Sequence, residues 1–355
     1  MEKYILIMAG GVGSRFWPRS RKNLPKQLLN IFGQHTMIQE TVDRIRNLVP
    51  PENILIITNK VQKALVEEQL PFIPKENVVA EPVGRNTAPC VGLAAKIISK
   101  KSKDAVFVTL PADHLIKDRK KFIDTLNKSI EFAYNSKGLV TFGITPTRPD
   151  TGYGYINFEK SEVEKNIHKV IKFVEKPDAD KAKLYLESGD YFWNSGMFVW
   201  RTDVILDEIS AYLPNLSKGL IELDKSIGTN EFDGALEVFF NSIKGISVDY
   251  GIMEKSDKVF MIEGDFDWSD VGSWETVYEL SSKDENANAV VGDVYTKKTN
   301  SSYIYSPNKF TSVIGLKNVV VIDTPDALLV CNRENVQEVK DAVEYLTKNN
   351  KPELI

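Results

Sequence analysis

The sequence has little cysteine, no long apolar run and no excess of charge of either sign. Its two cysteines, Cys90 and Cys331, are far apart and outside any CxxC spacing, so neither a disulfide framework nor a zinc site is indicated. The 45 Lys and Arg residues nearly balance 49 Asp and Glu, and the formal charge of -4 provides no basic field of the kind that gathers nucleic acid. The apolar stretch at the N-terminus is too short for a signal peptide or a membrane span. We therefore expect a cytoplasmic protein that binds neither nucleic acid nor membrane, and in which local groups bind any anionic ligand.

Short apolar, β-branched runs alternate with helical patterns in the first part of the chain. The runs lack the alternation of half-exposed strands and predict buried parallel strands. They lie at residues 4–8, 54–57, 105–110 and 139–142. Apolar residues at helical spacing in 38–49 and 91–98 predict helices between them, the second capped by Thr87. This order predicts an α/β fold with a doubly wound, mostly parallel sheet, whose ligands bind at the carboxyl ends of the strands.

The composition and the hydrophobic pattern of the sequence change at about Ser281. Connections rich in Asn and Lys separate short apolar runs, and residues 336–346 have a helical pattern. The hexapeptide repeat of a long β-helix is not evident. The sequence therefore predicts a main domain over residues 1–280 and a small β-rich C-terminal domain with a terminal helix over residues 281–355.

The first predicted strand ends in a glycine-rich loop, AGGVGSR, at residues 9–15. Small residues let backbone N–H groups approach an anion, and Arg15 adds a guanidinium group, which suits a triphosphate. The loop lacks the GK[ST] ending of a Walker loop, and Phe16 replaces the third glycine of the dinucleotide fingerprint. A tight turn that merely needs glycine is the alternative. Four further cations follow within a dozen residues and Pro25 fixes the backbone before Lys26, which favours an anion site.

Residues 10–27, GGVGSRFWPRSRKNLPKQ, resemble the signature GGxGxRLWPxSRxxxPKQ of the mannose-1-phosphate guanylyltransferases, or GDP-mannose pyrophosphorylases. Phe16 replaces the usual Leu, which we do not expect to matter. Residues 81–89, EPVGRNTAP, resemble the family segment EPxxRNTAP, which lies against the nucleotide. A carboxylate such as Glu81 can accept from the N1–H and 2-amino edge of guanine, a pair of donors that uracil and thymine lack. The nucleotide-binding residues so implied are Ala9, Gly10, Gly11, Gly13, Ser14, Glu81, Asn86, Thr87 and Pro111.

Two aspartates resemble the metal ligands of the same family. Asp113 ends a predicted strand within PADH, where an Asp alone is more often a turn former or a helix cap. Asp270 lies within WSDVGSW, which resembles the family segment WxDVGSW, with Asp267 as a nearby competitor. The resemblance implies Mg²⁺ on Asp113 and Asp270. Their separation of 157 residues means that only the resemblance brings them together, and His114 is not assigned as a base.

Three further segments resemble the part of the family that binds the sugar phosphate. They are TGYGYI at 151–156, FVEKP at 173–177 and WNSGMF at 193–198. Lys176 can neutralise the phosphate, Glu175 and Asn194 can bind hydroxyls, and Gly154 permits close approach of the backbone. Residues 247–255, SVDYGIMEK, resemble SxDYAIME with Gly251 in place of Ala, a departure that bears on helix stability and not on activity.

The resemblance covers nearly the whole chain and implies a nucleotidyltransferase that makes GDP-mannose and pyrophosphate from GTP and α-D-mannose 1-phosphate. A sugar-phosphate oxygen would attack the α-phosphorus in line, with no covalent intermediate. The catalytic residues so implied are Arg15, Lys26, Asp113, Lys176 and Asp270. The resemblance also implies a homodimer and, because the isomerase half of longer relatives is absent, transferase activity only. The alternatives are another nucleotide or sugar 1-phosphate, a regulatory protein that binds GDP-mannose without catalysis, and, least favoured, a dinucleotide-dependent dehydrogenase.

Overall fold

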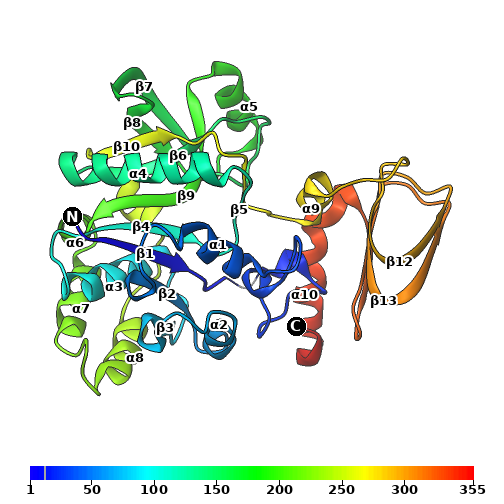
Figure 1. The fold of residues 1–355 in the computed structure, drawn as a ribbon, viewed down its shortest axis with the longest axis horizontal. Helices are drawn as coiled ribbons and strands as arrows, with labels where there is room; N and C mark the ends of the chain where they lie inside the picture. The colour runs from blue at the N-terminus through cyan, green and yellow to red at the C-terminus, as the bar shows by residue number, and fades with distance from the viewer. Residues whose placement is uncertain (12) are drawn as a thin grey trace. The chain divides into compact units, whose positions relative to one another are not determined.

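A computed structural model describes residues 1–11 and 13–355, and its chain divides into two compact units that are interleaved in sequence (Figure 1). Unit 1 consists of Met1–Gly10, Val42–Ala112 and Ile116–Trp268. Unit 2 consists of Gly11–Thr41, Asp113–Leu115 and Ser269–Ile355. The sequence analysis divides the chain once, at residue 281, and that domain boundary stays a prediction.

Unit 1 is built on a mixed sheet with the strand order β3-β2-β1-β4-β9-β6-β10-β8-β7. The strands are β1 (Lys3–Met8), β2 (Ile54–Asn59), β3 (Val78–Glu81), β4 (Val106–Pro111), β6 (Leu139–Ile144), β7 (Tyr155–Glu164), β8 (Ile167–Val174), β9 (Tyr191–Arg201) and β10 (Val259–Glu263). Strands β8 and β9 run against the others, so most of the sheet has one direction. The predicted α/β fold with a mostly parallel sheet is confirmed.

Helices cover the sheet of unit 1 (Figure 1). The helices of the chain are α1 (Met37–Ile45), α2 (Lys63–Gln69), α3 (Thr87–Ser99), α4 (Arg119–Ser136), α5 (Ala179–Ser188), α6 (Thr202–Tyr212), α7 (Pro214–Asp224), α8 (Phe232–Ser242), α9 (Trp274–Leu280) and α10 (Val339–Lys348). Two further short strands, β5 (Leu115–Ile116) and β11 (Trp268–Ser269), are not part of the large sheet of unit 1. In the described residues no helix is both long and apolar enough to cross a membrane.

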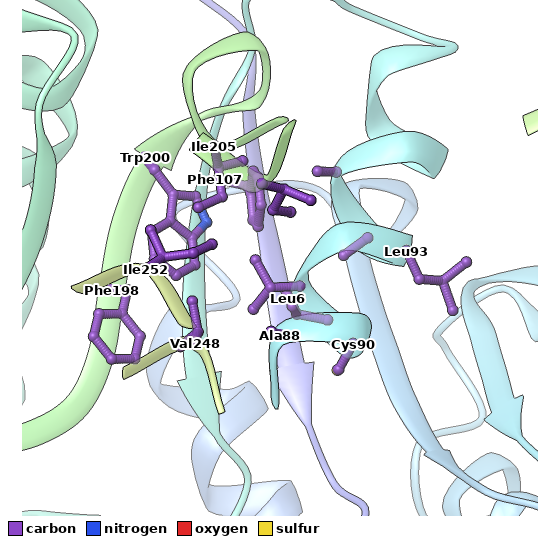
Figure 2. Close-up of a cluster of buried hydrophobic side chains, with 14 of the residues drawn as sticks. Leu6, Ala88, Cys90, Leu93, Phe107, Phe198, Trp200, Ile205, Val248 and Ile252 are labelled. Carbon is purple, nitrogen blue, oxygen red and sulfur yellow. The ribbon is translucent and has the colours of Figure 1, made fainter. Parts of the chain in front are cut away.

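The strands of unit 1 have continuous apolar sequences because both faces of the sheet are buried. In β1, Tyr4 and Leu6 belong to a cluster with residues of α3, α6, α7 and α8, whereas Ile5 and Ile7 are equally buried outside that cluster. Figure 2 shows part of it: Leu6 from β1 lies near Ala88 and Cys90 from α3, and Phe107 from β4 lies near Trp200 from β9. This burial explains why the predicted strand runs lack alternation.

The predicted cap of α3 is wrong by one residue. Asn86 is the N-cap, with φ 67°, and its side chain accepts from the backbone N–H of Thr87. The Thr87 hydroxyl instead accepts from the backbone N–H of buried Val248 at 2.8 Å. A second hydrogen bond joins the same two segments: the Ala88 N–H donates to the Ile246 carbonyl at 3.1 Å. Thr87 therefore satisfies a distant backbone donor and not its own helix.

Unit 2 contains a four-stranded sheet formed by β12 (Ala289–Lys297), β13 (Tyr303–Ile314), β14 (Val319–Asp323) and β15 (Leu328–Asn332). Strands β12, β13 and β14 are parallel neighbours and β15 is antiparallel. The core of the unit also includes residues from near the N-terminus: Phe16 and Trp17 pack with Trp274 and Tyr303. The predicted β-rich C-terminal part with its terminal helix is confirmed.

Candidate active site

Lys26 is the centre of a charged cluster in unit 2. Its side chain is almost fully buried, and its ammonium lies 2.9 Å from Asp113 Oδ2 and 2.5 Å from the backbone oxygen of Asp270. Burial by itself raises the pKa of the Asp113 carboxyl, but the charges of Lys26 and His114 and the hydrogen bond from Lys26 outweigh it and lower that pKa. Two aspartates distant in sequence therefore contact one ammonium, and Asp113 is held ionised.

The glycine-rich loop is shaped around the same lysine. Gly13 has φ 63°, and a methyl group there would lie 2.7 Å from Lys26 Cβ, so only glycine fits. The Gly13 carbonyl accepts from the Ser20 hydroxyl at 2.7 Å, and the Gly11 carbonyl accepts from Gln27 Nε2 at 2.9 Å. Ser14 begins the short helix η1 (Ser14–Phe16). Side chains from residues 20–27 thus hold the described part of the loop.

The five cations of this region have different surroundings. Arg19 is buried, donates to Asn30 and stacks on Tyr305, with its guanidinium 4.2 Å from the ring centroid. Arg21 forms an ion pair with Asp326 at 2.9 Å. Arg15 is exposed and has no ion pair with any residue that the structure describes. Arg19 and Arg21 therefore stabilise unit 2, whereas the ligand contact of Arg15 stays a prediction.

Strained backbone follows Asp270. Val271 has φ 48° although it is β-branched, and its side chain is fully buried. Its N–H donates to the Ser269 hydroxyl at 3.1 Å. A methyl group at Gly272 would lie 3.0 Å from Asp270 Oδ2. Such a conformation persists only where the surroundings fix it, and it is often found at functional sites. Here it sets the position of the Asp270 carbonyl and carboxylate.

The donor set of this cluster consists of oxygen atoms, which hard divalent cations such as Mg²⁺ prefer. No group of three or more His, Cys, Asp or Glu side chains is arranged to hold a metal ion among the described residues. The ammonium of Lys26 nevertheless contacts the Asp113 carboxylate and the backbone carbonyl of Asp270, so it lies close to two residues that carry carboxylates. Mg²⁺ typically takes one or two protein carboxylates and completes its shell with water and substrate phosphates. The residues present therefore fit a magnesium ion that is shared with a phosphate ligand. Asp267, the competitor for the metal position of Asp270, belongs to unit 1, whereas Asp113 and Asp270 both belong to unit 2.

In unit 1, the ends of three parallel strands carry residues predicted to bind the nucleotide. Ala9 and Gly10 follow β1, Glu81 ends β3 and Pro111 ends β4, where it pairs with Met8. A methyl group at Gly10 would lie 3.9 Å from Glu81 Oε2. Asn86 and Thr87 begin α3 a few residues later. The structure thus places Glu81 beside the glycine at the end of β1.

Glu81 is a buried acid with unused hydrogen-bonding capacity. Its side chain is 8% exposed, and its Oε1 has no hydrogen-bond partner among the described residues. Burial raises the pKa of its carboxyl to about 8. An unpaired buried oxygen costs free energy unless a ligand satisfies it. Glu81 therefore carries its proton at neutral pH in the free protein, and a ligand that donates to its buried oxygens would satisfy them and favour the ionised form.

The four residues predicted to bind the sugar phosphate lie together in unit 1. A methyl group at Gly154 would lie 2.5 Å from Glu175 Oε2 and 3.3 Å from Asn194 Cβ. The Asn194 N–H donates to the Gly154 carbonyl at 2.8 Å. Lys176 is exposed, forms an ion pair with Glu175 and has φ 45°. This group combines an exposed ammonium, a carboxylate and an amide, which are suitable partners for a phosphate and hydroxyls.

Sequence reasoning missed two acids beside this group. Asp249 Oδ1 accepts from Asn194 Nδ2 at 2.9 Å. Burial raises the pKa of Glu254, and its further influences include a backbone hydrogen bond and the charge of Glu175. Both acids lie in SVDYGIMEK, which was matched to the family without a role. Asp249 is half-buried between buried Val248 and Ile252, and an acid between apolar residues was the available signal.

Comparison with known proteins gives the class first. Residues 4–287 match the family model described as Nucleotidyl transferase, and residues 293–346 match that of the MannoseP isomerase/GMP-like beta-helix domain. A mannose-1-phosphate guanylyltransferase of Klebsiella pneumoniae is 41% identical over 98% of this chain and 74% of that protein, and one of Escherichia coli is 40% identical over the same shares. A crystal structure from Thermus thermophilus, titled mannose-1-phosphate geranyltransferase, has a TM-score of 0.88 and 32% identity over 98% of this chain and all of its own.

The chain therefore belongs to the mannose-1-phosphate guanylyltransferase family of nucleotidyl transferases. The family predicted from the sequence motifs is confirmed. Enzymes of this class act on a nucleoside triphosphate and a sugar phosphate and generally use a divalent metal ion.

Proposed function

We propose that this protein is a mannose-1-phosphate guanylyltransferase that converts GTP and α-D-mannose 1-phosphate into GDP-mannose and pyrophosphate. The observation that carries the proposal is the contact of one buried ammonium, that of Lys26, with Asp113 and with the Asp270 carbonyl. Both substrates are anions, so their mutual repulsion is the first barrier to reaction. A cluster that combines a cation with two metal-binding carboxylates is suited to lower it.

In this proposal the residues of unit 2 serve the triphosphate. Asp113 and Asp270 would hold Mg²⁺, which neutralises charge on the reacting phosphate and the leaving pyrophosphate when it is bound. Lys26 and Arg15 add positive charge, and the backbone of Gly11, Gly13 and Ser14 binds phosphate oxygens. In unit 1, Glu81 accepts from the guanine edge. Glu81 does so as a carboxylate, so binding of guanine must ionise it against its raised pKa. Adenine presents an acceptor at N1 and cannot satisfy that carboxylate in the same way, so the ionised form favours GTP over ATP.

The sugar phosphate is assigned to the group around Gly154. Lys176 binds the phosphate, and Glu175 and Asn194 bind sugar hydroxyls. No general base is needed, because the attacking phosphate oxygen is already ionised. Catalysis then consists of positioning and charge neutralisation, with in-line attack on the α-phosphorus and departure of pyrophosphate.

A pyrophosphate-release assay tests the proposal. Purified protein is combined with GTP, ATP, UTP or dTTP and with mannose or glucose 1-phosphate, with and without Mg²⁺. We expect the highest kcat/KM for GTP with mannose 1-phosphate, no turnover in EDTA and recovery on addition of Mg²⁺. A preference for another pair would reassign the substrates. Binding of GDP-mannose without any turnover would instead make the protein a regulatory subunit.

We also propose that the protein is a cytoplasmic homodimer with a catalytic domain over residues 1–280 and a small domain over 281–355. The family resemblance supports the dimer, and two free cysteines suit a reducing compartment. Sedimentation equilibrium tests the dimer: a mass near 40.0 kDa at micromolar protein would contradict it.

A further inference from the structure

Asp249 occupies an unusual turn within unit 1. It begins a π-helical segment, Asp249–Met253, in which the Glu254 N–H donates to the Asp249 carbonyl at 3.0 Å. Its neighbours Val248 and Ile252 are buried in the hydrophobic cluster shown in Figure 2. The Val248 N–H is also fixed by the Thr87 hydroxyl. Because its flanks are anchored on both sides, the Asp249 carboxylate is held in a defined position, and π-helical turns are frequent at functional sites.

The turn also explains the glycine at position 251. A methyl group there would lie 3.0 Å from Leu213 Cδ1 and 3.4 Å from Leu213 Cδ2. An alanine would therefore press on a packed leucine, so glycine fits this core better. The segment is consequently held by packing rather than by helix propensity.

The hydrogen bonds of Asn194 define the direction of its side-chain amide. Its Oδ1 accepts from the Gly196 N–H and from the Thr141 hydroxyl, each at 3.1 Å. A backbone N–H can only donate, so this end of the amide must be the oxygen. The Thr141 hydroxyl has a single hydrogen, which Asn194 Oδ1 shares with the Met197 carbonyl, also at 3.1 Å. Asp249 accepts one Nδ2 hydrogen at 2.9 Å. The second Nδ2 hydrogen is then the remaining donor of this amide.

We propose that Asp249 is a positioning residue for the sugar phosphate: it holds the Asn194 amide so that the second Nδ2 hydrogen donates to a sugar hydroxyl oxygen. The inference rests on the proposed function, because it takes Asn194 as a residue that contacts the sugar. The inference gives the direction of that hydrogen bond: the protein donates and the hydroxyl oxygen accepts. A carboxylate does this better than a neutral group, because a hydrogen bond to an ionised acceptor is shorter and stronger.

The charges around Asp249 make its ionisation sensitive to pH. Burial and the neighbouring Glu175 raise the pKa of Asp249 to about 6, whereas the bond from Asn194 and the charge of Lys176 oppose the rise. Glu175 and Lys176 follow β8, and Glu254 lies at the end of the same turn. As pH falls through about 6, Asp249 becomes protonated and holds Asn194 less strongly. Binding of the sugar phosphate should weaken in the same range.

Steady-state kinetics of Asp249→Ala and Asp249→Asn test the inference. We expect Asp249→Ala to raise KM for mannose 1-phosphate about tenfold, the equivalent of one lost charged hydrogen bond. KM for GTP should be unchanged and kcat within about twofold of wild type, as expected for loss of uniform binding. Asp249→Asn retains an acceptor, so its effect should be smaller. Asp257→Asn, at an exposed site of unit 1, is the matched control and should behave as wild type.

Two further readouts separate positioning from general damage. Asn194→Ala and Asn194→Ala with Asp249→Ala should have the same KM for mannose 1-phosphate, because Asp249 acts through Asn194. Between pH 5 and 8 the ratio of KM values of Asp249→Asn and wild type should fall toward one at low pH, and this ratio cancels the titration of the substrate. Additive effects in the double variant, an unchanged KM in Asp249→Ala, or equal changes in KM for both substrates would overturn the inference. Wild-type protein that does not use mannose 1-phosphate would overturn the proposed function and the inference together, before any variant is made.

Discussion

At the scale of single residues, Lys26 is the most demanding test of the proposed chemistry. Replacement by Met keeps the apolar stem but removes the charge that contacts Asp113 and the Asp270 carbonyl. We expect kcat/KM to fall roughly a hundredfold, since loss of one electrostatic contact in the transition state costs about 3 kcal/mol. Lys351→Met, at an exposed lysine of unit 2, is the control. Activity of Lys26→Met within about threefold of wild type would remove Lys26 from catalysis.

Glu81 makes a prediction about stability that does not depend on its role. Its folded pKa, about 8, lies above the ordinary value of 4.5, so the folded state binds one more proton than the unfolded chain between these pH values. Its contribution to stability is complete below pH 4.5 and is lost as pH rises through about 8. Glu81→Gln removes this pH dependence. The free energy of unfolding of the variant relative to that of wild type should therefore rise between pH 5 and 8, by up to about 1.4 kcal/mol per pH unit.

Urea unfolding of both proteins across this pH range measures the difference. Glu76→Gln, at an exposed glutamate, serves as the control and should follow the wild-type curve. Parallel curves for Glu81→Gln and wild type would show that the Glu81 carboxyl is ionised at neutral pH in the folded protein.

Individual site residues could be predicted from the sequence only where a motif contained them. The motifs led to Lys26, Asp113 and Asp270, which the structure brings together, but their roles stay predictions. The sequence could not separate Arg15 from Arg19 and Arg21, because ion pairs with distant residues such as Asp326 are invisible along the chain. It also gave no role to Asp249, whose partner Asn194 is 55 positions away.

At the scale of elements, the glycine-rich loop should tolerate a methyl group at one glycine and not at another. Gly13→Ala forces a left-handed conformation on alanine, costing roughly 1–2 kcal/mol, and places Cβ 2.7 Å from Lys26 Cβ. We expect a lower free energy of unfolding and a kcat/KM reduced at least about tenfold, since Lys26 must move. A Cβ at Gly11 would meet nothing within 4 Å, so Gly11→Ala should unfold at the wild-type denaturant concentration. Equal stability of the two variants would contradict the assigned role of Gly13.

Elements were predictable where local pattern and burial agree. The strands β1, β2, β4 and β6 were expected from their sequences because a strand buried on both faces is a continuous apolar run. The cap of α3 was misplaced because the Thr87 hydroxyl serves Val248, a partner about 160 residues on. Nothing local predicts the left-handed backbone of Val271 either, since its cost is offset by burial in the core of unit 2.

At the scale of the whole molecule, the interleaving of the two units was not predictable from changes in sequence texture. Trp17 donates to the Leu354 carbonyl at 2.8 Å, and Trp274 donates to the Trp17 carbonyl at 3.1 Å. The segment after the glycine-rich loop is therefore part of the core of unit 2, together with the C-terminal residues. Contacts between the two ends of a chain leave no periodic pattern in either end, so the sequence alone favoured a single boundary.

The interleaving predicts which segments each substrate should protect from hydrogen exchange. The proposed function assigns mannose 1-phosphate to the group around Gly154, and it assigns GTP with Mg²⁺ to the glycine-rich loop, Asp113, Asp270 and Glu81. Mannose 1-phosphate alone should slow exchange in peptides 153–176 and 191–201, whereas GTP with Mg²⁺ should slow it in 11–28 and 81–88. A ligand at a hundred times its Kd stabilises the folded protein by about 2.7 kcal/mol. It therefore slows, by up to about a hundredfold, the exchange of those amides whose opening requires the ligand to dissociate.

The β12 and β13 strands carry no assigned ligand contact, so their peptides serve as the internal control. Lys176→Ala should abolish the protection by mannose 1-phosphate and leave that by GTP, because the phosphate of the sugar loses its cation while the residues assigned to the nucleotide are unchanged. If mannose 1-phosphate instead protected residues 11–28 in the absence of nucleotide, the assignment of the sugar phosphate to the group around Gly154 would be wrong. Protection of every peptide by either ligand would indicate global stabilisation and would leave neither set of residues as the binding site.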